Sequence, residues 1–195
     1  AQKGHFWFEW RLQAFLKQLE ASKISTNEPM NGLDIGCGCG LVRKQIEQHC
    51  SWVTDGADVD RAALEQNETI KGRTMLYNIR DCKKEFKENY DFIFIFDVLE
   101  HIEDTQEFIN SALFHLKKGG FLFVNVPAIN GLLSRYDRAV GHLRRYDKRM
   151  LSAELKTLDI VDMRYWGLSL LPLLISRGLF LSKHISETEV IQKGL

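Results

Sequence analysis

Three glycines in one short stretch mark the place where this chain can hold a ligand. The sequence GLDIGCGCG at residues 32–40 puts Gly36, Gly38 and Gly40 at every second position. Glycine permits backbone dihedral angles, and a close approach of a ligand, that a side chain would block. The residues around the turn predict a buried strand before it and a helix from Leu41 onward. In a doubly wound sheet, such a turn at the carboxyl end of the first strand lies where ligands bind.

An acidic residue follows at the spacing that suits a ribose. Asp58 lies 22 residues after Gly36, close to the ~20 residues expected between a glycine turn and a ribose-binding carboxylate. Asp60 competes for this role, because side chains alternate along a strand and both aspartates can point the same way. We favour Asp58, since Val59 then lies where an apolar side chain covers an adenine.

The turn departs from the dinucleotide-binding pattern, which has a further glycine three residues after its second. This chain has Leu41 there, and the turn contains no arginine to assist a phosphate. An oxidoreductase with a nicotinamide cofactor is therefore a weakened alternative. A protein that binds an adenosyl cofactor without catalysis is a second alternative.

Side chains that can take up a proton occur in two places. His101 follows an apolar run at residues 91–96, and the polar segment 128–149 contains Tyr136, His142 and Tyr146. A general base is useful only where the acceptor loses a proton during attack. For both histidines a structural role, with bonds to neighbouring groups, stays open.

Two adjacent arginines in the same polar segment can recognise an acidic acceptor. Arg144 and Arg145 can form bidentate bonds to a carboxylate or phosphate. The alternative is that they form salt bridges with Asp137 and Asp147.

Alternating strands and helices position these groups. The pattern predicts an α/β fold with a doubly wound, mostly parallel sheet and right-handed crossovers. The run 91–96 is apolar without alternation, as expected of a parallel strand covered on both faces. We expect strands at 30–35, 52–57, 74–77, 91–96, 121–126 and 160–166, and helices at 5–20, 41–48, 62–64, 104–116, 151–158 and 168–181.

The first helix has an apolar face that begins in a dense aromatic stretch. Phe8, Leu12, Phe15 and Leu19 recur at helical spacing. The helix either packs over the core or forms a lid over the ligand site. As a lid it would bring Arg11 to a carboxylate, and we count Arg11 among the candidate cofactor-binding residues.

Composition is that of an ordinary globular chain of 195 residues, with 45% hydrophobic and 27% charged residues. The 26 basic residues balance the 26 acidic ones, so net charge supplies no argument for a nucleic-acid partner. The four cysteines form no C-x-x-C pair. We expect reduced thiols, no metal site and a cytoplasmic location.

An apolar stretch at 167–181 is shorter than the ~20 residues of a membrane span. Pro172 and Arg177 interrupt it. It can pack on the core as a helix, contact the inner membrane face, form a groove for a lipid chain, or form a dimer face.

Three segments together resemble motifs of class I S-adenosylmethionine-dependent methyltransferases. LDIGCGCG at 33–40 is similar to their first motif, and FDVLEHI at 96–102 to the segment after strand four. LKKGGFL at 116–122 is similar to the turn before strand five, with Lys118 where the family usually has proline. The opening HFWF with Arg11, and GHLRRY at 141–146, resemble a subgroup linked to bacterial cell-surface or lipid-linked biosynthesis.

The resemblance implies S-adenosylmethionine as cofactor and S-adenosylhomocysteine as product. Asp34 would orient the turn or the amino group of the cofactor. Gly36 and Gly38, with Cys37 between them, would pass close to the methionine moiety. The residues Asp97, Val98 and Leu99 would line the wall near the same end.

The resemblance also implies contacts at the adenosine end. Asp58 would hold the ribose, and Val59 would lie beside the adenine. Asn78 and Ile79 occupy the position after strand three that contacts the adenine. Many relatives carry aspartate where this chain has Asn78, and an amide oxygen can still accept a hydrogen bond from the adenine amino group.

The implied reaction is in-line methyl transfer to O or N of a small, or a lipid- or saccharide-linked, acceptor. The catalytic candidates are His142, Tyr146 and His101. The expected organisation is an N-terminal helix or lid (1–28), a methyltransferase domain (29–181) with a substrate-side insertion (128–149), and a tail (182–195). The family's sheet has order 3-2-1-4-5 with a sixth and an antiparallel seventh strand. No seventh strand is recognisable before Leu195.

Overall fold

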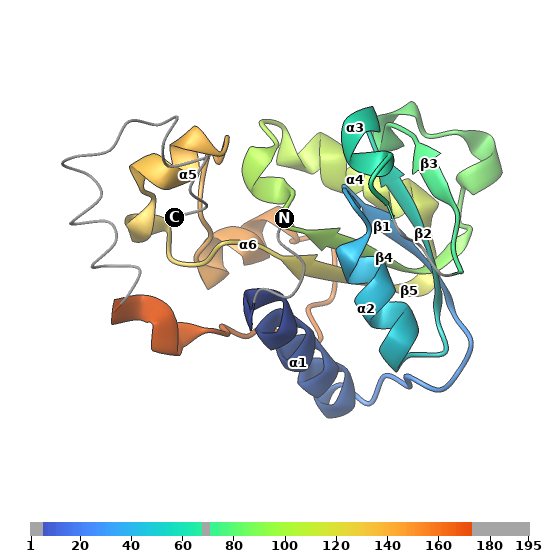
Figure 1. Cartoon of the computed structure of the whole chain (residues 1–195), viewed down its shortest axis with the longest axis horizontal. Helices are drawn as coiled ribbons and strands as arrows, with labels where there is room; N and C mark the ends of the chain where they lie inside the picture. The colour runs from blue at the N-terminus through green and yellow to red at the C-terminus, as the bar shows by residue number, and fades with distance from the viewer. Residues whose placement is uncertain (1–5, 68–70, 173–195) are drawn as a thin grey trace. The chain divides into compact units, whose positions relative to one another are not determined.

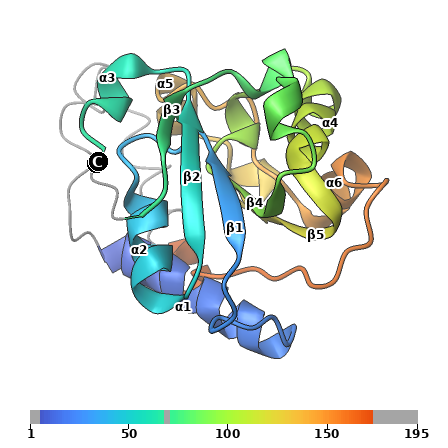
Figure 2. The same ribbon diagram turned by 90° about the vertical axis from the view of Figure 1, so that its right-hand side faces the viewer.

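Five parallel strands form one sheet in the order β3-β2-β1-β4-β5 (Figures 1 and 2). The computed structural model describes residues 6–67 and 71–172. The predicted order 3-2-1-4-5 is confirmed. The strands are β1 (Asn31–Ile35), β2 (Val53–Asp58), β3 (Thr74–Leu76), β4 (Tyr90–Phe96) and β5 (Leu116–Asn125).

The described residues divide into two units. Unit 1 contains the sheet and comprises residues up to Val98 together with Asp104–Asn125, and unit 2 comprises Leu99–Glu103 and the residues from Val126 onward. The domain boundaries expected above stay a prediction.

The strand β4 owes its place inside the sheet to an uninterrupted apolar sequence. Residues 92–95 of β4 are fully buried, as expected for a strand covered on both faces. Gly32 in β1 allows close packing, because a Cβ there would lie only 1.9 Å from the ring of Phe92. Ile35 pairs with Ala57 of β2 and with Ile95 of β4. The carboxyl ends of these three strands therefore meet at one edge of the sheet.

Helix α1 (Phe6–Ala21) packs over this core, as one of the two interpretations of its sequence predicted. In Figure 2 it runs across the lower end of the sheet. Its Phe15 makes edge-on contacts with Phe94, Phe96 and Phe123, with ring centroids 5.1–5.8 Å apart. The aromatic face of the helix thus fixes it to β4 and β5.

The remaining helices of unit 1 are α2 (Leu41–His49), α3 (Arg61–Leu64) and α4 (Thr105–His115). Asp104 caps α4, since its side chain accepts a hydrogen bond of 2.9 Å from the backbone N–H of Glu107.

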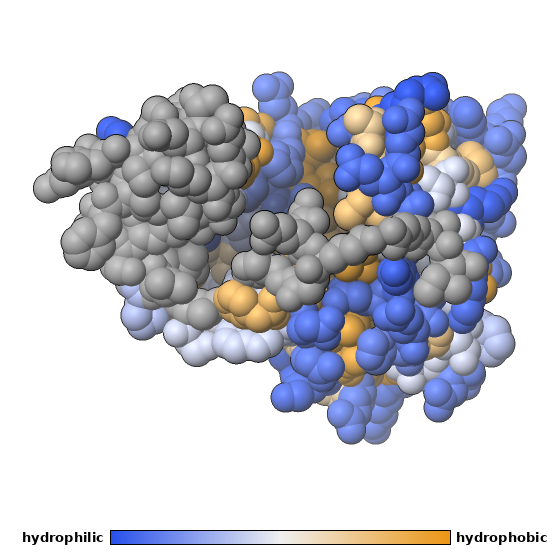
Figure 3. All heavy atoms as spheres, in the orientation of Figure 1, coloured by the Kyte–Doolittle hydropathy of each residue, from blue (hydrophilic) through white to orange (hydrophobic). Residues whose placement is uncertain are grey.

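Hydrophilic residues predominate on the face shown in Figure 3, over the part that holds α2 and α3.

The strand β5 begins earlier than the sequence predicted. It starts at Leu116 and includes the Lys-Lys-Gly-Gly stretch that was expected to be only a turn. The pairing of β4 with β5 is irregular between Tyr90 and Phe92, and Gly119 has a positive φ of 76°. The irregularity lets the chain enter the ladder directly from the end of α4.

Unit 2 is built from short elements. In its described residues these are three 3₁₀ turns, η3 (Leu99–His101), η4 (Asn130–Leu132) and η5 (Leu168–Leu170), and two helices, α5 (Arg135–Ala139) and α6 (Lys148–Glu154). The helix predicted at 151–158 therefore begins and ends earlier than expected.

The prediction of a strand at 160–166 is wrong, because these residues form no strand in the structure. Ile160 and Val161 are 43% and 66% exposed, so their apolar side chains have no sheet to pack on. Of the helix predicted at 168–181, only η5 and the next two residues are described, and the tail from 182 lies outside the described residues. None of the described helices is long and apolar enough to cross a membrane.

Candidate functional site

The glycine turn has the backbone conformation that its sequence predicted. Gly36, Gly38 and Gly40 have φ angles of 73°, 50° and 80°, a region that side chains disfavour. A Cβ on Gly36 would lie 2.6 Å from Cγ2 of Val98, whereas a Cβ on Gly38 would meet no atom within 4 Å. The turn therefore packs closely on one side and is open at Gly38.

The structure separates the roles of the two competing aspartates. Asp58 accepts hydrogen bonds from the backbone N–H of Gly38 (2.8 Å) and of Asp60 (2.9 Å). Asp60 instead caps α3 by accepting from Ala62 and Ala63. Each carboxylate oxygen has two acceptor lone pairs. Asp58 can therefore hold the glycine turn and also accept a ribose hydroxyl.

One carboxylate oxygen of Asp34 is a buried hydrogen-bond acceptor. Its side chain is 2% exposed, and Oδ2 has no hydrogen-bond partner among the described residues. Burial raises the pKa of Asp34 to about 7, against the opposing effect of Arg43 and Arg11. An ammonium group placed here would both satisfy Oδ2 and favour the ionised carboxylate. The amino group of an S-adenosylmethionine molecule has this chemistry.

Asp97 is held in a strained backbone conformation directly after β4. Its φ is +57°, which is uncommon for a residue other than glycine and is often found at functional sites. Its carboxylate accepts from Nη1 of Arg11 (2.5 Å) and from Nδ2 of Asn125 (2.6 Å). Arg11 thus meets a carboxylate of the protein itself. The contribution of Asn125 was missed, although its place at the end of β5 could have indicated it.

The remaining adenosine-side candidates differ in exposure. Val59 is 69% exposed, whereas Ile79 is buried. Asn78 accepts a 3.1 Å hydrogen bond from the N–H of Arg80 and so caps the turn η1 (Ile79–Asp81). The contacts of these three residues with an adenine stay a prediction.

Two further candidates for the cofactor site, Cys37 and Leu99, are buried. Burial raises the pKa of the Cys37 thiol to about 12, which makes this residue a neutral filler of the turn. Asn67, which the sequence analysis missed, donates to the carbonyl of Gly38 at 3.1 Å. Leu99 is fully buried and belongs to unit 2.

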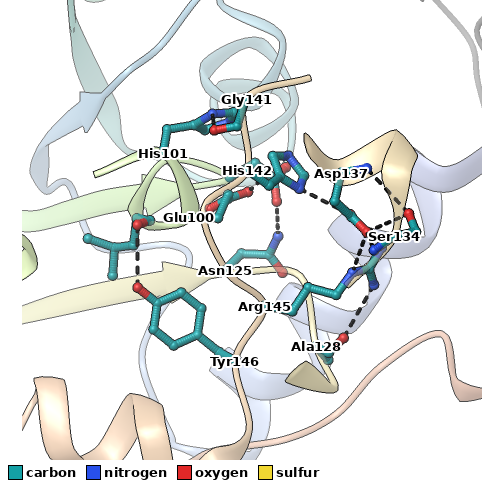
Figure 4. Close-up of polar contacts among 12 residues, drawn as sticks. Glu100, His101, Asn125, Ala128, Ser134, Asp137, Gly141, His142, Arg145 and Tyr146 are labelled. Carbon is teal, nitrogen blue, oxygen red and sulfur yellow. Dashed lines mark hydrogen bonds and ion pairs between the residues drawn. The ribbon is translucent and has the colours of Figure 1, made fainter. Parts of the chain in front are cut away.

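In unit 2, His142 lies between two buried carboxylates (Figure 4). Its Nδ1 donates to Oδ1 of Asp137 at 3.2 Å, and its Nε2 lies 3.9 Å from Oε1 of Glu100. His101 packs edge-on against His142, with ring centroids 4.8 Å apart, and its Nδ1 donates to the carbonyl of Gly141. The structure thus brings two of the catalytic candidates together.

Asp137 is the anchor of this cluster. It accepts two hydrogen bonds from the Arg145 guanidinium (2.7 and 3.0 Å) and one from the hydroxyl of Ser134 (2.7 Å). Burial alone would raise the pKa of Asp137, but the hydrogen bonds from His142, Arg145 and Ser134 outweigh it and hold the pKa well below its usual range. For Arg145 the salt-bridge alternative is confirmed, with Asp137 as its partner. Arg144 instead reaches the backbone carbonyl of Glu103 at 3.4 Å.

Tyr146 is poorly suited to accept a proton. Its side chain is buried, and its hydroxyl donates to the carbonyl of Leu99 at 3.3 Å. Burial raises its pKa to about 12. Its hydrogen bond connects Leu99 to the polar segment, which is a positioning contact within unit 2.

Comparison with known proteins supports one family. Residues 5–161 match a family model described as a methyltransferase domain. A ubiquinone biosynthesis O-methyltransferase of Coxiella burnetii is 30% identical over 96 residues, which cover 47% of this chain and 41% of that protein. A protein of the same name from Brucella ovis is 26% identical over 139 residues, covering 65% and 55%. The chain thus spans about half the length of the curated relatives it matches.

Solved structures share the fold at low sequence identity. Phosphoethanolamine N-methyltransferase 2 of Haemonchus contortus, solved with S-adenosylmethionine, is similar with a TM-score of 0.68 and 18% identity, covering 94% of this chain and 47% of that one. The YcgJ protein of Bacillus subtilis is similar with a TM-score of 0.59 and 16% identity, covering 74% and 67%. With most of its residues matched by the family model and its sheet in the order 3-2-1-4-5, this chain belongs to the methyltransferase-domain family of class I, whose cofactor is S-adenosylmethionine.

Proposed function

We propose that this protein transfers the methyl group of S-adenosylmethionine to a small-molecule acceptor, at a hydroxyl oxygen in preference to a nitrogen. The observation that carries the proposal is one edge of the sheet, where the open glycine turn and Asp58 occur together with Oδ2 of Asp34, which no described residue bonds. The curated relatives are named as O-methyltransferases, which supports oxygen as the acceptor atom. A lipid- or saccharide-linked acceptor stays a prediction.

Each group of the edge suits one part of the cofactor. Asp58 accepts a ribose hydroxyl while it holds the N–H of Gly38. Asp34 accepts from the amino group, and the absence of a side chain at Gly38 admits the methionine moiety. Asp97, fixed by Arg11 and Asn125, presents its carboxylate at the same edge. Val59, Asn78 and Ile79 are assigned to the adenine.

When bound, the cofactor supplies an electrophilic methyl group on a sulfonium. The protein then has to hold the acceptor in line, and orientation contributes roughly 7–11 kcal/mol in favourable cases. His101 and His142 are the two imidazoles that lie together in unit 2. We assign to them the binding of the acceptor and the removal of its proton. Tyr146 serves to position the backbone of Leu99.

The test uses the whole chain, methyl-labelled S-adenosylmethionine and a panel of small phenols and amines. We expect label on a phenol, and we expect His142→Ala to lower turnover by about 10²-fold or more, as for loss of an acid–base group, with little change in cofactor affinity. Chain that shows no affinity for S-adenosylmethionine in calorimetry would contradict the proposal. Label on amines alone would contradict the preference for oxygen.

A further inference from the structure

A carboxylate and two imidazoles converge in unit 2 as metal ligands do. Glu100, His101 and His142 each offer one ligand atom, and these atoms lie within 4.8 Å of one another. Figure 4 shows the three side chains gathered beside the segment that carries Gly141. Imidazole nitrogen suits zinc and other first-row transition cations, and two imidazoles with one carboxylate are a common ligand set for such ions.

Both rings are already turned for coordination. Nδ1 of His142 donates to Oδ1 of Asp137 (3.2 Å), and Nδ1 of His101 donates to the carbonyl of Gly141 (3.1 Å). Metal-binding histidines almost always use their second nitrogen in this way, because the outer hydrogen bond fixes the tautomer and the direction of the ring. The arrangement assigns the ligand role to Nε2 of each ring.

The two groups that accept hydrogen bonds from the histidine rings, Asp137 and the carbonyl of Gly141, are themselves held in place. Asp137 is held by the fork of Arg145 and by Ser134. Gly141 has a φ of +87°, a backbone conformation that side chains disfavour. The N–H of Leu143 donates to the carbonyl of Glu100 at 2.8 Å, which ties the two ligand segments together. Hydrogen bonds within unit 2 therefore hold the backbone that carries the three ligands.

We propose that Glu100, His101 and His142 bind one divalent transition-metal cation of the Zn²⁺ or Mn²⁺ type. Ligand bonds of about 2.0–2.2 Å require the three ligand atoms, now within 4.8 Å of one another, to move closer to a common centre. Three protein ligands leave further coordination positions for water or an oxygen of the acceptor. A hydroxyl bound there loses its proton more readily. With the cation in place, His101 and His142 act on the acceptor as metal ligands and not as bases themselves. Binding of the cation stands by itself, and only its action on the acceptor rests on the proposed function.

The experiment is a titration of the whole chain, freed of metal by chelation, with Zn²⁺ alone and with Mn²⁺ alone, followed by calorimetry. We expect about one equivalent to bind with at least one of the two ions. His101→Gln is the first variant because this side chain is exposed, and its affinity should fall at least tenfold. Asp137→Asn, which leaves the three ligands intact, should weaken binding about 10–100-fold.

His49→Gln is the matched control, because His49 lies on α2 with its Nδ1 on the carbonyl of Gln45, outside the cluster. Its affinity should equal that of the unmodified chain. Circular dichroism confirms that each variant is folded. Lack of binding by folded protein, or equal binding by His101→Gln and the unmodified chain, would overturn the metal site. Neither outcome touches the methyltransferase proposal, which S-adenosylmethionine binding tests separately.

Discussion

Two aspartates at the end of β2 have different roles because their side chains accept hydrogen bonds from different parts of the backbone. Asp58 and Asp60 are two positions apart, and both carry the charge that a ribose site needs. In the structure, Asp58 holds the N–H of Gly38, and Asp60 holds two N–H groups at the start of α3. Only Asp58 is tied to the turn that faces the proposed cofactor.

This difference predicts contrasting variants. Asp58→Ala removes both the ribose acceptor and a bond that holds the turn, so affinity for S-adenosylmethionine should fall at least tenfold in calorimetry. Asp60→Ala removes a helix cap and should cost about 1 kcal/mol of stability while leaving the affinity nearly unchanged. Equal affinities of the two variants would contradict the assignment of the ribose to Asp58.

Asp34 predicts a pH dependence of stability. Its pKa is about 7 in the folded chain, against an ordinary value of 3.8, because burial disfavours the carboxylate. The folded state therefore holds the proton more tightly than the unfolded state. The contribution of Asp34 to stability falls as the pH rises from about 4 to about 7, by up to about 4 kcal/mol, and changes little above that range.

Urea unfolding at about pH 5 and about pH 8 checks this dependence. Asp34→Asn, which cannot ionise, should lose less stability than the unmodified chain when the pH is raised across this interval. An identical loss in both proteins would show that Asp34 is not the titrating group.

At the scale of elements, the aromatic side chain of Phe15 is a main contact between α1 and the sheet. Phe15 contacts rings on β4 and β5 and is buried in the core cluster. Arg11, one turn earlier on the same helix, supports Asp97 at the edge of the sheet. The packing of α1 therefore also places a polar contact of the candidate site.

Phe15→Ala should lower the free energy of unfolding by about 3–5 kcal/mol, because it removes a large buried side chain and leaves a cavity. Phe6→Ala is the control on the same helix, since Phe6 is 47% exposed, and it should change stability by no more than about 0.5 kcal/mol. Urea unfolding measures both. A loss below about 1 kcal/mol for Phe15→Ala would contradict the packing of α1.

At the scale of the whole molecule, the two units carry different groups. The candidate residues for the cofactor lie in unit 1, apart from Leu99, and the histidine cluster lies in unit 2. Ligands that stabilise one unit should therefore slow backbone exchange there first.

Hydrogen exchange measured by mass spectrometry makes this separation visible. S-adenosylmethionine should slow exchange at the glycine turn 36–40 and around Asp58. Zn²⁺ or Mn²⁺ alone should slow exchange in 99–103 and 137–146. Protection by the cation that appears only in the glycine turn would argue against the division of roles between the units.

The sequence alone was sufficient for the sheet order and the glycine turn, and the choice of Asp58 as the ribose ligand stays a prediction. These features depend on local patterns: apolar runs for buried strands, glycines for positive φ, and a short spacing between motif residues. The prediction of a strand at 160–166 was wrong because a strand also needs the edge of a neighbouring strand to pair with. Local composition does not indicate whether such an edge is present.

Tertiary structure decided the histidine cluster and the early start of β5. His101 and Gly141 are 40 residues apart in the chain, yet their hydrogen bond helps to set the direction of an imidazole. Likewise, only the folded chain brings His142 between Asp137 and Glu100. Residue types and spacing specify which groups are present, but the distances between groups from different segments arise only when packing and backbone hydrogen bonds fix the chain between them.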